Sequence, residues 1–276
     1  MKLAGSRILL TGATGGIGRC LALALARRGA RLALTGRDAA RLAVLAGQLS
    51  NAGAHAAILP VDLAQPGSHA ALVAGALESM GGIDILVNNA GRSHFGAFAD
   101  QDEAAMRELI ETNLTVPLLL TRAVLPHLLA HNSGCIANIG SVFGAIGFPY
   151  NAAYSATKFA LRGFSEALRR ELADTGVKVL YVAPRATATA MNGPEARALH
   201  SETGTAVDAP EKVAAAIADA LARDRKEVII GGPEGFFARL NGLLPRVVDG
   251  ALIKQGRVAA RHLLESGSAK QARPGA

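Results

Sequence analysis

The chain has 276 residues, of which 50% are hydrophobic and 18% are charged, so a large buried core is feasible and global disorder is excluded. The net charge of +7 is concentrated after residue 236, which argues against a general nucleic-acid-binding face. The two cysteines, Cys20 and Cys135, are too few for a disulfide framework or a four-thiolate zinc site. We expect both to be buried and reduced in a cytoplasmic protein.

Residues 115–130 come nearest to a membrane-crossing span. Pro117, Arg122 and Pro126 interrupt this run, so we do not expect it to cross a membrane. Lys2 leads directly into a strand-like segment, and we therefore expect no secretory signal peptide.

Short apolar runs alternate with longer segments of helical periodicity. The predicted strands are Arg7–Thr11, Arg31–Thr35, Ala56–Pro60, Ile83–Asn88, Cys135–Ile139, Lys178–Ala183 and Glu227–Ile230. The predicted helices are Gly16–Arg28, Asp38–Ala52, Gln65–Ser79, Asp102–Leu129, Ala152–Ala173 and Pro210–Arg223. This alternation indicates βαβ units with right-handed crossovers. It predicts an α/β fold with a Rossmann-type doubly wound parallel sheet of about seven strands and helices on both faces.

The first predicted strand leads into a glycine-rich turn between Thr11 and Gly18, and a helix follows. Glycines allow a tight turn and let the backbone approach a pyrophosphate at the positive end of that helix. Such turns also occur without a ligand. The position directly between the first strand and an apolar helix favours a dinucleotide site.

The second predicted strand ends in the sequence Thr35-Gly36-Arg37-Asp38. Gly36 occupies the place where NAD-binding folds often carry an acidic residue for the ribose hydroxyls. The guanidinium of Arg37 suits a ribose 2′-phosphate instead, so we expect NADP(H) to be favoured over NAD(H). The alternative is that Arg37 is simply solvated at a helix start capped by Asp38.

Tyr154 and Lys158 stand four residues apart in a helical segment and therefore share one face. A nearby ammonium lowers a phenol's pKa from about 10 toward neutrality, which makes tyrosine a workable proton donor or acceptor. Such pairs also arise by chance on solvated helices. The histidines are scattered without ligand spacing, so we expect no metal site.

Further motifs complete an ordered set with the glycine-rich turn and the Tyr154/Lys158 pair. They are Asp62, the run Asn88-Asn89-Ala90-Gly91, Asn113, Ser141, and the segment from Pro184 to Thr189. Together these motifs resemble the short-chain dehydrogenase/reductase family in its non-extended branch, over roughly residues 2–230.

The resemblance implies specific catalytic roles. Tyr154 would protonate the carbonyl oxygen, and Ser141 would position that oxygen. Lys158 would hold the nicotinamide ribose and lower the pKa of Tyr154, and Asn113 would interrupt its helix to hold a water that relays protons to Lys158. Taken singly, Ser141 is equally a turn cap and Asn113 a surface amide.

The same resemblance implies a set of cofactor contacts, with Asp62 and Leu63 at adenine. The implied cofactor-binding residues are Gly12, Thr14, Gly16, Ile17, Gly18, Arg37, Asp62, Leu63, Asn89, Ala90, Gly91, Tyr154, Lys158, Pro184, Thr187 and Thr189. Taken alone, Asp62 is also readable as a strand-end cap.

Three departures from the family pattern bear on the site. Gly15 also fits the glycine spacing of the extended, epimerase-like branch, although the distance from Ser141 to Tyr154 favours the non-extended branch. Arg185 replaces the glycine that usually follows Pro184. The basic residue often present in the glycine-rich turn of NADP users is missing.

These features predict an NADP-dependent oxidoreductase that interconverts a ketone and a secondary alcohol. Phe95, Phe98, Phe143 and Phe148 are candidates for an apolar pocket and equally for the core, and a lipophilic acyl-chain or aromatic ketone is favoured. The alternatives are a non-catalytic dinucleotide-binding sensor or scaffold, and an epimerase-like use of the same pair. The family commonly forms dimers and tetramers, so a homodimer or homotetramer is expected, with a small-molecule substrate as the other partner and no nucleic acid.

The predicted catalytic domain spans residues 1–235, with residues 185–210 as a mobile polar lid. A basic amphipathic extension follows at 236–265, and residues 266–276 are predicted to be a disordered tail. In the extension, Gly242, Pro245 and Gly250 argue against one straight helix. It could cover the substrate pocket, pack against a second subunit, or lie on an anionic membrane surface, which would place this cytoplasmic protein peripherally at the membrane.

Overall fold

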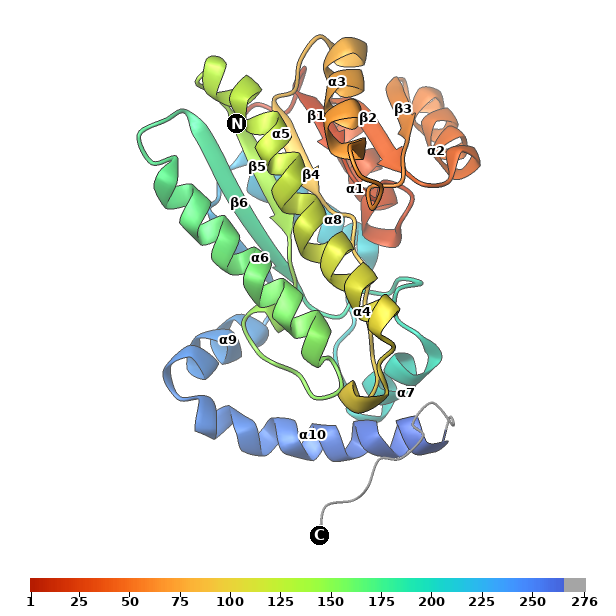
Figure 1. The fold of residues 1–276 in the computed structure, drawn as a ribbon, viewed down its shortest axis with the longest axis vertical. Helices are drawn as coiled ribbons and strands as arrows, with labels where there is room; N and C mark the ends of the chain where they lie inside the picture. Colours follow the sequence, from red (N-terminus) through yellow and green to blue (C-terminus); the bar gives the residue numbers. More distant parts are fainter. Residues whose placement is uncertain (266–276) are drawn as a thin grey trace.

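The computed structural model describes residues 1–265, and a seven-stranded parallel sheet forms its centre (Figure 1). Its strands are β1 (Arg7–Leu10), β2 (Arg31–Gly36), β3 (Ala56–Pro60), β4 (Ile85–Asn88), β5 (Gly134–Ile139), β6 (Val177–Pro184) and β7 (Glu227–Ile230). They lie in the order β3-β2-β1-β4-β5-β6-β7. The predicted fold class is confirmed.

Helices cover both faces of the sheet, because each presents an apolar side to the buried strands. The helices beside the sheet are α1 (Gly16–Ala26), α2 (Ala39–Asn51), α3 (Ser68–Met80), α4 (Glu103–Ile110), α5 (Val116–Ala130), α6 (Ala152–Glu171) and α8 (Pro210–Ala222). One core cluster joins the sheet to α1, α2 and α8, and the other joins it to α3, α5 and α6. The free cysteines Cys20 and Cys135 are both buried in the first cluster.

The strand order reverses between β1 and β4, which are neighbours although two strands separate them in sequence. Chains leaving the carboxyl ends of these two strands turn to opposite sides of the sheet, and this arrangement opens a crevice where ligands bind in such folds. The glycine-rich turn follows β1, and the Asn89–Gly91 segment follows β4. The fold therefore brings two of the predicted motifs to one place.

The single helix predicted over Asp102–Leu129 is in fact two α-helices joined by a π-helical turn, η2 (Glu111–Thr115). Within residues 1–265, the run Glu103–Ala130 is the only one with the length and hydropathy of a membrane-crossing helix. Core helices meet the same criterion. Here Leu120 and Val124 are fully buried in the core cluster with the sheet, as in a core helix.

The polar segment 185–210, predicted to be a mobile lid, includes a helix in the structure. It contains α7 (Pro194–Glu202), which is anchored by the buried side chain of Leu199. Asp208 forms an isolated parallel bridge with Thr187 at the base of the segment.

The C-terminal extension forms two helices, α9 (Glu234–Leu243) and α10 (Pro245–Glu265). Proline begins the second helix, as expected from its fixed φ, whereas Gly250 lies inside α10 without ending it. In Figure 1, α10 runs across the lower end of the molecule, below α6 and α7. The predicted disordered tail, 266–276, lies outside the described residues.

Candidate active site

The glycine-rich turn leaves no room for side chains at two of its glycines. Gly12 has a φ of +62°, and a Cβ there would lie 2.8 Å from Cα of Ala90. A Cβ at Gly18 would lie 2.1 Å from the carbonyl oxygen of Gly12. Gly15 caps α1 without a side-chain hydrogen bond, so the first N–H groups of this helix are left for a ligand.

A polar network joins this turn to the segment after β4. The Thr11 hydroxyl accepts hydrogen bonds from the backbone N–H groups of Asn89 and Ala90, at 2.9 and 3.0 Å. The Asn89 amide donates to the carbonyl oxygens of Thr11 and Gly12, at 3.0 and 3.1 Å. Asn89 therefore stabilises the glycine-rich turn, and both of these hydrogen bonds use its side-chain amide nitrogen.

Two guanidinium groups stand at the end of β2. Arg37 is 68% exposed and lies 3.9 Å from Glu108, whereas Asp38 caps α2 by accepting a hydrogen bond from the N–H of Arg41. The Asp38 cap and the exposed position of Arg37 are as the alternative interpretation describes, and the phosphate-binding role of Arg37 stays a prediction. Arg41 also donates to the carbonyl oxygen of Thr14 at 3.0 Å, which ties α2 to the glycine-rich turn. Sequence reasoning missed Arg41, although its spacing of four from Arg37 was the available signal.

Asp62 follows β3 and occupies a local turn. Its carboxylate accepts a hydrogen bond from the N–H of Ala64 at 3.1 Å, and a weaker one from the Gln65 amide. Leu63 is buried. The N–H of Val61 bonds the carbonyl oxygen of Gly36, which places this turn beside the end of β2.

Asn113 lies in the π-helical turn and is buried, not a surface amide. Its side chain accepts from the N–H of Arg92 at 2.8 Å and donates to the carbonyl oxygen of the same residue at 2.9 Å. It also donates to the Thr157 hydroxyl. A Cβ at Gly91 would lie 3.3 Å from the Asn113 oxygen and 3.7 Å from the Lys158 nitrogen, so the three residues meet. Arg92 is the partner that the sequence did not indicate.

Ser141 and Tyr154 come together beside an aromatic wall. Ser141 caps η3 (Val142–Gly144) by accepting from the N–H of Phe143 at 3.1 Å. The Phe143 ring meets the Tyr154 ring edge-on at 6.2 Å and stacks on Phe148 at 4.8 Å between centroids. Of the four predicted pocket phenylalanines, Phe98 instead lies 60% exposed.

The pKa of Tyr154 differs from the sequence expectation. Burial raises it above its ordinary value, and hydrogen bonding to Ser141 opposes this only in part. Lys158 lies with its nitrogen 5.7 Å from the Tyr154 ring centroid and donates to the carbonyl oxygen of Ile139 at 3.1 Å. Burial lowers the pKa of Lys158 itself to about 8. Tyr154 is therefore the neutral phenol at pH 7.

The segment after β6 closes over the glycine-rich turn. Pro184 is the last residue of the strand, and Thr187 donates to the carbonyl oxygen of Arg185. A Cβ at Gly16 would lie 2.5 Å from the Thr189 methyl group. A hollow of about 550 Å³ lies between this segment and α7, with Thr189 in its lining but neither Ser141 nor Tyr154.

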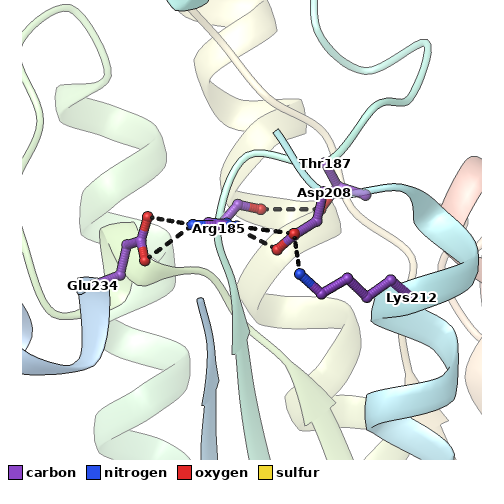
Figure 2. A network of polar contacts seen from close by, with 5 residues as sticks. All are labelled: Arg185, Thr187, Asp208, Lys212 and Glu234. Atoms are coloured by element: carbon purple, nitrogen blue, oxygen red, sulfur yellow. Dashed lines mark hydrogen bonds and ion pairs between the residues drawn. The ribbon is translucent and has the colours of Figure 1, made fainter. Parts of the chain in front are cut away.

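Arg185 replaces the family glycine and builds a network that ties this segment down, as Figure 2 shows. Its guanidinium makes two hydrogen bonds to Asp208, at 2.8 and 3.0 Å, and another to Glu234 at 3.1 Å. Lys212 also bonds Asp208. Asp208 is 4% exposed, and the Arg185 hydrogen bonds hold the pKa of its carboxyl below the ordinary value. The end of β6, the base of the 185–210 segment and α9 are thus joined.

The residues present fit a dinucleotide. The turn offers a backbone cradle that any Cβ at Gly12 or Gly18 would fill, and an uncapped helix N-terminus suited to a pyrophosphate. Lys158 reaches Gly91 in the segment after β4, and Tyr154 lies beside Lys158. Within residues 1–265, no cluster of three or more histidine, cysteine or acidic side chains is placed to hold a metal ion.

Comparisons with known proteins find similarity over most of the chain. The short chain dehydrogenase family model matches residues 6–199. The chain is 34% identical over 228 residues to the ketoacyl reductase HetN of Nostoc, a match that covers 83% of this chain and 79% of that protein. A short-chain dehydrogenase structure from Streptomyces avermitilis is 31% identical, with a TM-score of 0.76 over 92% of this chain and 99% of that one. A short chain dehydrogenase/reductase from Burkholderia phymatum in complex with NAD is 23% identical, with a TM-score of 0.81 over 90% of this chain and 96% of that one, and shares the fold.

Lys158→Met is expected to stabilise the protein at pH 7. The pKa of Lys158 is lowered from 10.5 to about 8, so folding at pH 7 buries a charge at a cost. As the pH rises from 8 to 10.5, the folded protein loses this proton before the unfolded chain does, and wild-type stability recovers. The substitution also removes the hydrogen bond to Ile139, which offsets part of the gain. We therefore expect the free energy of unfolding to rise by about 1–2 kcal/mol at pH 7, and this gain to shrink above pH 8. Thermal unfolding across pH measures this, with exposed Lys2→Met as the control; a lower Tm at pH 7 would contradict it.

Arg185→Gly, which restores the family residue, is expected to destabilise the protein. It strips the buried carboxylate of Asp208 of its two guanidinium hydrogen bonds, and we expect a loss of about 2–4 kcal/mol. Glu234→Gln keeps the Asp208 pair and serves as the matched control, with a loss below about 1 kcal/mol. Urea unfolding measures both. Equal stability of Arg185→Gly and wild type would show that the network contributes nothing.

Proposed function

The chain belongs to the short-chain dehydrogenase family, and from that premise we propose that it is an NADPH-dependent reductase that converts a lipophilic ketone to a secondary alcohol. Membership makes it an oxidoreductase of the carbonyl–alcohol class that uses a nicotinamide dinucleotide. The observation that carries the finer proposal is the meeting of Tyr154, Ser141 and Lys158 at the carboxyl edge of the sheet.

In this proposal Tyr154 is the general acid. Because burial raises its pKa, the phenol holds its proton at neutral pH and can give it to the substrate oxygen. The bound nicotinamide supplies the hydride for the carbonyl carbon. Proton and hydride together convert the ketone to the alcohol and leave Tyr154 as phenolate, which must regain a proton.

Ser141 and Lys158 support that proton transfer. The Ser141 hydroxyl stands at the Tyr154 hydroxyl, where it can donate to the same substrate oxygen and orient it. Lys158 brings a positive charge to the ring of Tyr154, which favours the phenolate once it has formed. The contact of Asn113 with Gly91 and Lys158 offers a polar route along which a proton can return.

The cofactor preference rests on the basic end of β2. Because Gly36 occupies the position where an acidic residue often stands, no carboxylate is present there to repel a 2′-phosphate. Arg37, the next residue, is exposed. Arg41 is held against the glycine-rich turn through Thr14 and adds a second guanidinium nearby. Two forked donors at one ribose suit a phosphate better than two hydroxyls.

The lipophilic substrate class is supported by the aromatic wall beside Tyr154. Phe143 and Phe148 stack on one another, and Phe143 meets the catalytic ring edge-on. The relative named a ketoacyl reductase points to an acyl-chain ketone. A fatty acyl ketone can lay its chain along such a wall, whereas a sugar would leave its hydroxyls unpaired.

A cofactor-binding sensor is the second candidate, and it would retain the cradle without turnover. The juxtaposition of Ser141 with Tyr154 counts against it, because a sensor needs no proton donor. An epimerase-like reaction, suggested by Gly15 alone, would regenerate its nicotinamide within each cycle and consume no net cofactor.

Tyr154→Phe tests turnover. It removes the proton donor while keeping the ring against Phe143, so NADPH consumption with an acyl ketone is expected to fall about 10²–10⁴-fold. NADPH affinity, measured by calorimetry, should stay within a small factor of the wild-type value. Tyr150→Phe, on a ring outside the Ser141 contact, is the control. Undiminished consumption by Tyr154→Phe would contradict the assignment, and absence of any NADPH consumption by wild type with carbonyl substrates would favour the sensor.

Arg37→Ala and Arg41→Ala test the cofactor preference. Loss of one charged hydrogen bond to a phosphate is expected to weaken NADPH binding by about 10–100-fold, with NADH binding nearly unchanged. Arg27→Ala, an exposed arginine at the end of α1, is the control. Separate calorimetric titrations with the two cofactors measure the preference. Equal binding of NADH and NADPH by wild type would overturn it.

A further inference from the structure

We propose that the outer face of α9 and α10 binds the surface of a membrane that contains anionic lipids. The surface consists of the exposed apolar and basic side chains of residues 236–264, and we call it the basal face. This inference goes beyond the reaction and does not depend on which ketone or cofactor the enzyme uses.

Exposed large apolar side chains are denser on the basal face than elsewhere within residues 1–265. Seven large hydrophobic residues here are exposed, and Leu243 at 80% exceeds every other exposed large hydrophobic within residues 1–265. Leu243, Leu244 and Val247 lie around the turn between the two helices and form an apolar tip. The seven are Phe236, Phe237, Leu243, Leu244, Val247, Ile253 and Leu264. A concentration of this kind marks an interaction site.

Helical periodicity explains why these side chains remain outside. Val248, Gly256, Ala259 and Leu263 are buried and repeat at intervals of three, four or eight residues, so they form the inner side of α10. A Cβ at Gly256 would lie 3.1 Å from Pro149, which shows how closely this side approaches the protein. The opposite side has no neighbour among the described residues that would bury it.

The same outer side carries the positive charge. Arg246, Lys254 and Arg257 are spaced by eight and three residues, are all exposed, and form no ion pair with another described residue. Arg239 is exposed on α9. Arg261 lies on this side too, but it pairs with Glu202 at 3.1 Å. Cations beside an exposed apolar tip are the composition of a segment that lies in the lipid headgroup layer.

Charge decides between a membrane and a second copy of the chain. A two-fold dimer through the basal face would bring the row of Arg246, Lys254 and Arg257 against the same row of the second copy, and like charges repel at a desolvated interface. An anionic lipid surface attracts them, at about 1 kcal/mol for each cation near the surface. The apolar tip then gains by leaving water for the acyl boundary.

The basal face also lies close to the catalytic residues. The Asn241 side chain donates to the carbonyl oxygen of Ala145, and Gly256 approaches Pro149. Both of those partners belong to the loop between Ser141 and Tyr154. A membrane bound at this face would therefore adjoin the edge of the sheet where the site opens (Figure 1).

Co-sedimentation of the full chain with vesicles tests the proposal. We expect binding to vesicles of phosphatidylglycerol mixed with phosphatidylcholine, weaker binding to phosphatidylcholine alone, and release of the anionic vesicles as salt rises. Lys254→Gln with Arg257→Gln should weaken binding to the anionic vesicles roughly 30-fold. The control is Arg27→Gln with Arg223→Gln, which removes two exposed cations at the opposite end of the molecule.

The apolar tip has a closely matched control. Val247 and Val44 are both helical valines, 62% and 64% exposed. Val247→Asp is expected to weaken anionic-vesicle binding about 10-fold or more, and Val44→Asp to leave it unchanged. Circular dichroism checks that both variants remain folded. Equal effects of the two valine variants, no vesicle binding by wild type, or equal binding to both kinds of vesicle would overturn the proposal. So would a dimer that binds no vesicles and dissociates in Val247→Asp, because the basal face would then be a subunit interface.

Discussion

The functional site depends on the contact between the segments that come after β1 and β4. Thr11 accepts two backbone hydrogen bonds there, Asn89 returns two, and Gly12 and Gly18 approach neighbouring backbone more closely than a side chain would permit. These segments leave a parallel sheet at the point where its strand order reverses. The contact therefore holds the proposed pyrophosphate cradle against the half of the molecule that carries the catalytic groups.

Much of this arrangement is dictated by sequence pattern. Alternation of buried runs and amphipathic helices predicts a parallel sheet, and the loops that leave the strands then gather at its carboxyl edge. The fold brings Ser141, Tyr154, Lys158 and Asn113 close together, and their catalytic roles stay predictions. The pKa values of the site residues were harder to predict from the sequence. The pattern predicted a lowered pKa for Tyr154, but burial dominates, and burial is a property of the whole core that a spacing of four residues does not encode.

Contacts between segments that are distant in the sequence also could not be predicted from the sequence pattern. Arg185 appeared only as a departure from a family glycine, and its partners Asp208 and Glu234 lie 23 and 49 residues further on. The hydrogen bond from Arg41 to Thr14 similarly joins two elements. Local propensity predicted the helix break at Pro245 correctly, because proline acts on its own backbone. It overrated Gly250, which is exposed inside α10, because a glycine's helical cost is small and the helix is held by buried residues elsewhere, such as Val248 and Ala259.

The Arg185 network also has a bearing on how the protein is made. Synthesis proceeds from the N-terminus, and the sheet and its helices are nearly all encoded before residue 231. Glu234 leaves the ribosome later than any strand, so Arg185 and Asp208 become available to each other before their third partner does. During translation the segment 185–210 would therefore reach its final arrangement last, when α9 emerges. A nascent chain paused before that point would contain a formed sheet and the glycine-rich turn. The segment after β6, which lies over that turn, would not yet be bonded to the C-terminal helices.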